Sequence, residues 1–350
     1  MVSIRRVHPG VYIKETLDAM EMTAKEFSFR TGISERTLSA IINGDGDITF
    51  DVAYKLSSYF DNSVSYWVNL QTQYKVFLQE KKEEELINQE WSLIKSIKQY
   101  LLNEKYIKTS DGKKDIVSKC RELAGVNSLL SLNQKDLFAC LKEQQIKANL
   151  NYFFQNFYLA LALKEARKKK NNSFNKEILL NLIDEIRRMT IQDPKVFYPR
   201  LQQIFAESGV SFVLLPYLPK SNIYGATKWF GKDSVMLAIS NRGESADLFW
   251  FTLFHEISHV LMGHKRETLL NIEGIEDKEA DAMASEILIP KKEWDIFIKD
   301  KNFNKLAIKK FANKIGIHPC IVLGRLHKEN KIPYGVFDKT FHVKYQICRT

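Results

Sequence analysis

The sequence has neither a membrane-spanning run nor the cysteine pattern of a secreted protein. Its four cysteines are far apart and include no CxxC pair: Cys120, Cys140, Cys320 and Cys348. This spacing is typical of free thiols in a reducing compartment and argues against a disulfide framework or a zinc finger. The first residues lack the apolar core of a signal peptide, and the most apolar stretch, near residues 152–163, is too short to span a bilayer. We therefore expect a cytoplasmic protein without a membrane partner.

The sequence also lacks an internal repeat, and its length of 350 residues predicts two or three domains. Apolar residues make up 45% and charged residues 27%, which is ordinary for a globular protein and excludes a disordered one. The net charge of +10 is unevenly distributed. Residues 1–80 carry −2 and residues 191–290 carry −4, whereas residues 81–190 carry +7 and residues 291–350 carry +9. The basic excess therefore lies in the middle and at the end of the chain.

Helical periodicity dominates the sequence. It predicts five short helices near the N-terminus, at residues 11–20, 24–31, 35–42, 51–60 and 64–78. Long helical stretches rich in Lys and Glu follow to about residue 190. We expect an α+β protein that is mostly α and has four parts. These are a five-helix domain over 1–78, a helical connector over 79–190, a domain with a small sheet over 191–290, and a basic helical extension over 291–350.

Strand patterns occur only in the third part. Segments with β-branched and aromatic residues predict a small antiparallel or mixed sheet, at residues 209–215, 223–230 and 234–240. A hairpin turn is predicted between the last two segments. Two helices follow, over 247–263 and 276–288, and the sheet is expected to pack on them. The extension is predicted to form helices over 305–313 and 318–329, and residues 341–347 are a candidate closing strand.

A helix-turn-helix is predicted between residues 23 and 44. Thr23 and Glu26 match a capping box, and Gly32 can take the left-handed conformation that ends the first helix. Ser34 then caps a second helix, which stops at Gly44. Four apolar residues would form the buried side of this pair: Phe27, Ile33, Leu38 and Ile41. In such a unit the second helix enters the major groove of DNA.

Two stretches of this region resemble the HigA-type antitoxins of the XRE repressor class. They are VHPGVYIKE from residue 7 and TGISERTLSAIING from residue 31, and the resemblance covers about residues 5–75. It implies binding to double-stranded operator DNA, usually as a homodimer. The side chains that it places toward bases or phosphates are Glu35, Arg36, Ser39 and Asn43. Because the domain carries −2, cations such as Arg30 and Arg36 must gather on one face to attract phosphates. A helical docking domain is the alternative.

The segment HEISH at residues 255–259 matches the HExxH pattern. His255 and His259 lie one helical turn apart on the same face and can share one metal ion. Glu256 lies on the flank of that face, where it can take a proton from water. Imidazole and carboxylate ligands suit Zn²⁺. The alternative is a core helix with two satisfied histidines, but the apolar surroundings would make a buried Glu256 costly unless it had chemistry or a partner.

The segment EDKEADAMASEILIP begins at Glu276, 17 residues after His259. Its stripe of small residues, Ala280 and Ala284, allows close approach to the first helix. Together the two motifs resemble the ImmA/IrrE metallopeptidases within the gluzincin group. Four further segments match that family: GATKW from residue 225, SNR from residue 240, DLFWFTLF from residue 247 and IGIHPCIVLGRL from residue 315. The resemblance covers about residues 180–335 and implies a zinc peptidase.

The resemblance also implies the remaining residues of the site. Alignment on Ala280 places Asp277 where the family has its metal-binding Glu. Because Asp is one methylene shorter, the second helix must lie closer to the first, or Glu276 must provide the ligand instead. Asp281, one turn after Asp277, would accept a hydrogen bond from a ligand histidine. Glu279 points away from this face.

Two further alternatives concern the same site and the basic extension. His264 could act as a third ligand, as in metzincins, but the HExxHxxGxxH spacing is absent, so we expect a histidine at the helix end. The apolar segment 235–239 could present a strand edge to an extended peptide substrate. The extension over 291–350 could contact nucleic acid, although a structural role in the peptidase is the safer interpretation.

These features predict a DNA-binding regulator of the antitoxin type with a fused zinc endopeptidase, which acts on a repressor, toxin or antitoxin partner. The alternative is a non-enzymatic antitoxin or repressor, in which the peptidase fold binds a partner or senses a signal. The Asp in place of the third-ligand Glu supports that alternative.

Overall fold

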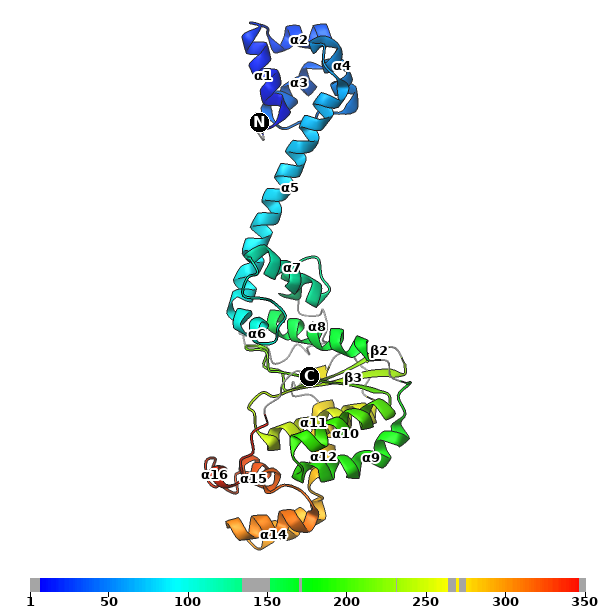
Figure 1. The fold of residues 1–350 in the computed structure, drawn as a ribbon, viewed down its shortest axis with the longest axis vertical. Helices are drawn as coiled ribbons and strands as arrows, with labels where there is room; N and C mark the ends of the chain where they lie inside the picture. Colours follow the sequence, from blue (N-terminus) through cyan, green and yellow to red (C-terminus); the bar gives the residue numbers. More distant parts are fainter. Residues whose placement is uncertain are drawn as a thin grey trace. The chain divides into compact units, whose positions relative to one another are not determined.

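The computed structural model describes residues 7–133, 152–169, 172–230, 232–263, 269–270 and 275–345, without the side chains of residues 269–270 and 275–276 (Figure 1). The chain divides into two compact units, Met1–Gln89 and Glu90–Thr350. Each unit has its own hydrophobic core. Among the described residues, none of the helices has both the length and the apolar character that crossing a membrane requires.

The first unit contains four of the five predicted helices and most of the fifth, which continues into the second unit. They are α1 (Pro9–Ala19), α2 (Ala24–Thr31), α3 (Glu35–Asn43), α4 (Phe50–Phe60) and α5 (Val64–Ile94). The backbone N–H of Glu26 donates to Thr23 Oγ1 over 3.2 Å, and Gly32 ends α2 with a φ of 68°. The Glu26 carboxylate pairs with Arg30 at 2.5 Å, so the second half of the expected capping box does not form. The helix α5 runs past residue 78 because no Gly or Pro interrupts its Lys- and Glu-rich continuation.

The core of the first unit confirms the predicted buried side of the helix pair. Phe27, Ile33, Leu38 and Ile41 are at most 3% exposed and pack in one cluster with residues from α1, α4 and α5. Ser28 supports the turn, because its hydroxyl donates to the carbonyl of Ile33 over 2.5 Å. The turn between α2 and α3 is therefore fixed by a glycine, a hydroxyl and a shared apolar core.

The second unit begins with helices around a buried acid. These are α6 (Lys98–Asn103), α7 (Lys113–Ala124) and α8 (Tyr152–Lys168), followed by α9 (Lys176–Arg188) and α10 (Pro194–Glu207). Glu90, at the end of α5, is fully buried and accepts hydrogen bonds from Arg121 Nε, Ser128 Oγ and Leu129 N, all at 2.7–2.8 Å. A buried carboxylate needs such partners, and they tie α5 to α7 and the segment after it.

The sheet contains the three predicted strands, β1 (Val210–Leu215), β2 (Gly225–Phe230) and β3 (Ser234–Ser240), and the short β4 (Leu269–Leu270). The strand order is β1-β3-β2-β4; β1 is parallel to β3, and β2 is antiparallel to both β3 and β4. The prediction that residues 235–239 present a free strand edge to a peptide is wrong, because β3 pairs with β1 on one side and with β2 on the other. The helix α8 covers one face of the sheet, and α10 and α11 (Ala246–Met262) cover the other (Figure 1).

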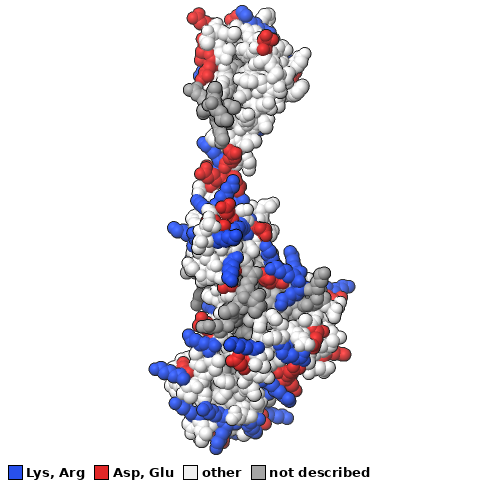
Figure 2. All heavy atoms as spheres, in the orientation of Figure 1, with Lys and Arg blue, Asp and Glu red and all other residues white. Residues whose placement is uncertain are grey.

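Helices form the rest of the second unit. They are α12 (Ile275–Leu288), α13 (Lys291–Lys299), α14 (Lys305–Ile315), α15 (Pro319–Lys328) and α16 (Asp338–Phe341). The expected strand over 341–347 is wrong for its described part, where Lys344 makes only a single bridge to Ser245. On the side of Val343 the ladder cannot extend, because Ser245 leads directly into α11. Many Lys and Arg side chains lie on the face of this unit that Figure 2 shows.

We predict that Gly10→Ala destabilises the first unit, because α1 and α3 cross closely at this position. A Cβ at Gly10 would lie 1.8 Å from the carbonyl oxygen of Ile41. Relief of this overlap requires backbone shifts, so the free energy of unfolding should fall by about 1–3 kcal/mol. Chemical denaturation of the full chain, followed by tryptophan fluorescence, measures the change. Lys14→Ala, at an exposed position of the same helix, is the matched control; equal stability of the two variants would contradict the close crossing.

Candidate metal centre

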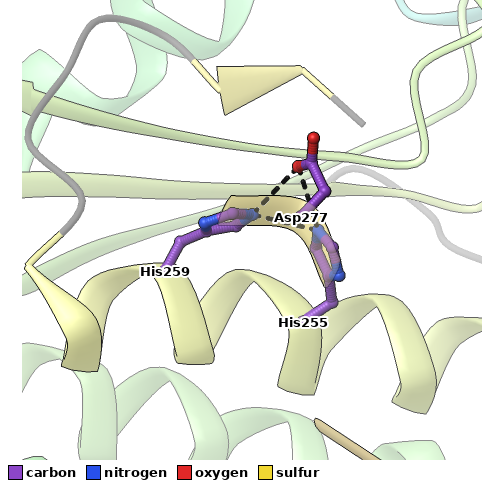
Figure 3. Close-up of side chains that lie close together, drawn as sticks. All are labelled: His255, His259 and Asp277. Atoms are coloured by element: carbon purple, nitrogen blue, oxygen red, sulfur yellow. Dashed lines mark hydrogen bonds and ion pairs between the residues drawn. The ribbon is translucent and has the colours of Figure 1, made fainter. Parts of the chain in front are cut away.

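Three side chains from two helices converge at the centre of the second unit (Figure 3). His255 and His259 extend from the same face of α11, and their Nε2 atoms lie 3.0 Å apart. Asp277 extends from α12, and its Oδ1 lies 3.5 Å from His259 Nε2 and 3.9 Å from His255 Nε2. Both histidines are buried, and the Asp277 side chain is 16% exposed. The three predicted ligands therefore lie around one point.

This convergence depends on close packing between α11 and α12. Ala280 and Ala284 are fully buried, and α11 is buried along most of its length by apolar side chains such as Phe254, Ile257 and Val260. Small residues at the contact let two helices approach closely. The short side chain of Asp277 can therefore reach the two imidazoles. An Asp ligand needs this closer approach of the two helices because its side chain is one methylene shorter than that of Glu.

The donor set and its spacing fit Zn²⁺. Two imidazole nitrogens and one carboxylate oxygen are a usual ligand combination for a catalytic zinc site, with one position left for water or substrate. Ligand atoms bound at about 2.0 Å to a tetrahedral ion lie about 3.3 Å from one another. The observed separations of 3.0, 3.5 and 3.9 Å bracket that value. Small side-chain adjustments would satisfy all three ligand bonds.

Glu256 is buried beside the two histidines. It is 1% exposed, and its Oε2 accepts a hydrogen bond from Thr227 Oγ1 of β2 over 2.7 Å. Gly225 on the same strand leaves room for the other carboxylate oxygen, since a Cβ there would lie 2.7 Å from Glu256 Oε1. Burial raises the pKa of Glu256, and the neighbouring imidazoles and the Thr227 hydrogen bond only partly oppose this effect. The sheet thus holds a basic carboxylate next to the ligand pair.

Asp281 orients His255 from the side opposite the convergence point. Its Oδ1 lies 2.8 Å from His255 Nδ1, which leaves Nε2 directed toward His259 and Asp277. Burial opposes the charged form of His255, but the hydrogen bond to Asp281 and the nearby carboxylates outweigh it and raise the pKa of this imidazole. The other oxygen, Oδ2, accepts a hydrogen bond from Lys328 of α15 over 3.4 Å. Carboxylate–histidine pairs of this kind orient metal ligands in many proteins.

The remaining predicted positions can now be placed. Glu276 is the second residue of α12, but its side chain and the whole of His264 lie outside the described residues, so neither alternative ligand is tested. Glu279 is exposed on α12. The sequence missed the contacts of Gly225 and Thr227 with Glu256, although both lie within the GATKW segment, and it also missed Lys328. These contacts join distant segments and leave no local periodic signal.

The five candidate DNA-contacting residues are all exposed in the first unit: Arg30, Glu35, Arg36, Ser39 and Asn43. Four of them lie on α3, where Asn43 Nδ2 lies 3.5 Å from Ser39 Oγ. Arg30 lies at the end of α2 and pairs with Glu26, which raises the pKa of its guanidinium. Part of its positive charge is thereby offset within the domain. Arg36 carries a guanidinium on the recognition helix itself.

Two protein families match separate parts of the chain. Residues 13–67 match the helix-turn-helix family, and residues 206–303 match the IrrE N-terminal-like domain, a peptidase family. The second match contains β1–β3, α11 and α12, and hence all three candidate ligands and Glu256. The first contains α2 and α3 and the five exposed positions.

Three individual relatives each match about a fifth to a quarter of the chain. The HTH-type transcriptional regulator YddM of Escherichia coli is 33% identical over 73 residues, which is 21% of this chain and 78% of that protein. The virulence-associated protein A' of Dichelobacter nodosus is 38% identical over 68 residues, and the match spans 19% of this chain and 59% of its own length. The HigA-family antidote protein of Coxiella burnetii is 32% identical over 25% of this chain and 96% of that chain, with a TM-score of 0.23.

The histidine and carboxylate geometry of α11 and α12 thus falls inside a recognised peptidase domain, and the α2–α3 pair falls inside a recognised helix-turn-helix. The chain belongs to the helix-turn-helix regulators related to YddM through its N-terminal domain, and it carries an IrrE N-terminal-like peptidase domain in its second unit.

Proposed function

We propose that the second unit is a zinc-dependent endopeptidase and that the first unit binds operator DNA, so that the chain is a regulator that hydrolyses a peptide bond in a partner protein. The observation that carries the proposal is the convergence of His255, His259 and Asp277 beside the buried Glu256. A general base next to a metal-ligand set is the arrangement that metal-assisted peptide hydrolysis uses.

Each residue of the centre has a distinct role in this proposal. His255, His259 and Asp277 hold the ion, and Asp281 fixes the ring of His255. A bound Zn²⁺ would polarise the substrate carbonyl and lower the pKa of water. Glu256 takes the proton from the attacking water and delivers it to the departing amine, and burial makes its carboxylate a stronger base than an exposed one. Thr227 keeps that carboxylate in place during both transfers.

The DNA-binding proposal rests on the exposed face of α3. The family match and the regulator name of YddM support it, together with the exposed polar side chains of Arg36, Ser39 and Asn43. Phosphate contacts position such a helix, and contacts with base edges give specificity. Binding as a homodimer and the identity of the partner protein are parts of the proposal that follow from the HigA-type resemblance.

We predict about one zinc ion per chain in the purified protein and its loss in His259→Ala. Removal of one imidazole leaves two ligands, which hold zinc far more weakly. Metal analysis after dialysis against a weak chelator measures the difference. His342→Ala removes an exposed histidine that does not belong to the ligand group and should keep full zinc content. Zinc that survives in His259→Ala would rule out the proposed centre.

We predict that Glu256→Gln binds zinc like the wild type but cleaves about 10²–10⁴-fold more slowly. The amide is nearly isosteric with the carboxylate but cannot accept the proton. The measurement is cleavage of co-expressed repressor, toxin or antitoxin candidates, followed by electrophoresis and mass spectrometry. Glu279→Gln, at an exposed position of α12, should cleave normally. Stoichiometric zinc without proteolysis by the wild type would favour the non-enzymatic partner-binding function instead.

We predict that Arg36→Ala weakens binding to the promoter DNA of its own gene, and that wild-type affinity falls steeply with salt. One phosphate contact fewer should reduce the slope of log affinity against log salt by about 1, whereas loss of a base contact should cost about 1–3 kcal/mol and relax sequence preference. Fluorescence anisotropy at several salt concentrations separates the two roles. Lys14→Ala, which removes a charge from α1, is the control, and salt-insensitive binding would contradict the proposal.

A further inference from the structure

Lys328 is a cation of the C-terminal extension that lies beside the candidate metal centre without belonging to its ligands. It is the last residue of α15, and its Nζ lies 3.4 Å from Asp281 Oδ2 and 4.4 Å from the centroid of the Phe251 ring. Asp281 hydrogen-bonds with His255 Nδ1, and Phe251 precedes His255 by one helical turn of α11. The ammonium group therefore lies on the side of His255 that faces away from the convergence point.

The backbone that carries Lys328 is fixed by the packing of α15. Three side chains of this helix are buried in the same core as the apolar residues of α11: Ile321, Val322 and Leu326. In addition, Arg325 donates to the carbonyl oxygen of Ile289, just after α12, over 3.0 Å. Because α15 is held against both helices of the metal centre, the start of the Lys328 side chain is fixed relative to Asp281.

The carboxylate of Asp281 is divided between two partners. Its Oδ1 lies 2.8 Å from His255 Nδ1, and its Oδ2 lies 3.4 Å from Lys328 Nζ. The terminal torsion of an aspartate is broad, and the Asp281 side chain is 44% exposed, so water competes for both oxygens. A cation at Oδ2 restricts the rotation of the carboxylate and keeps Oδ1 directed at the imidazole. Lys328 thus acts on the ring of His255 through Asp281.

The positive charge of Lys328 also has an effect of the opposite sign, because it repels a divalent ion at the convergence point. The Lys328 side chain is 61% exposed, so water and salt screen this repulsion. The orienting effect acts instead on the ring of His255, which is only 4% exposed. We therefore expect orientation to outweigh repulsion, so that Lys328 strengthens metal binding.

We propose that Lys328 is a positioning residue of the metal centre, which holds Asp281 in the orientation that directs His255 Nε2 at the ion. This role rests on the proposed zinc-peptidase function and adds to it a residue outside the matched peptidase segment, 206–303. Loss of a carboxylate that orients a ligand typically costs about 10–100-fold in metal affinity. Loss of the partner of that carboxylate should cost less, about three- to tenfold.

The zinc affinity of the full chain, measured by competition with a chromogenic chelator, tests this role without a peptide substrate. Lys328→Met keeps an apolar stem but removes the charge, and it should bind zinc about three- to tenfold more weakly than the wild type. Lys328→Arg returns a cation to the same place and should recover most of that loss. Lys331→Met removes an exposed lysine three residues later and should bind zinc like the wild type.

A double-mutant cycle shows whether the effect passes through Asp281. In an Asp281→Ala background, Lys328→Met should change zinc affinity no further, because the carboxylate that transmits its effect is gone. The visible spectrum of the Co²⁺-loaded proteins gives a second readout, since it depends on ligand geometry. Lys328→Met should alter this spectrum, whereas Lys328→Arg and Lys331→Met should keep that of the wild type.

The outcomes separate this role from the proposed function. If the wild type itself binds no zinc, the peptidase proposal is lost. If the wild type binds zinc but Lys328→Met binds it equally well or more tightly, Lys328 is not a positioning residue. A loss that Lys328→Arg does not recover, or one that persists in full in the Asp281→Ala background, would overturn the proposed role as well.

Discussion

Burial of ionisable side chains between two apolar helices is the constraint on which the second unit depends. His255, Glu256 and His259 are at most 4% exposed, and Asp277 faces them from α12. With neutral imidazoles, the cluster contains two carboxylates and therefore a negative charge that a low-dielectric interior does not tolerate without compensation. A divalent cation at the convergence point would supply that compensation. The same burial makes Glu256 a stronger base, so the stability requirement and the proposed chemistry have one physical origin.

The close packing of α11 and α12 explains how the short side chain of Asp277 can reach the two histidines. An Asp reaches less far than the Glu of the resembled family, and this difference favoured a non-enzymatic interpretation of the sequence. Ala280 and Ala284 are fully buried at the contact, and Asp277 Oδ1 comes within 3.5 Å of His259 Nε2. Because Ala280 and Ala284 let the two helices approach closely, the shorter side chain of Asp277 still reaches the histidines. The exchange of Glu for Asp alone does not argue against metal binding here.

The sequence predicted local features of the fold and site well, because their signals repeat within a few residues. The helix-turn-helix followed from caps, a glycine and apolar spacing, and the HExxH pair followed from one helical turn. The strand order could not be predicted, because the parallel pairing of β1 with β3 joins segments separated by β2. The contact between Thr227 and Glu256 also joins distant segments, so it could not be predicted from the sequence. For the same reason, Val235–Ile239 was wrongly predicted to present a free strand edge to a substrate. Asp281 was predictable only because the resemblance supplied an aligned helix.

The C-terminal extension acts partly as a structural element of the peptidase domain, and its charge distribution explains how. Lys328 binds the carboxylate that orients His255, and Arg325 donates to the carbonyl of Ile289 just after α12 while it stacks 4.4 Å from the Trp294 ring. These cations are therefore engaged with the helix that carries Asp277. Ile321 and Leu323 of α15 also line a cavity of about 760 Å³ beside α11 and α12. The extension therefore contributes both to the metal centre and to its surroundings. A chain that ended after α12 would lose that support.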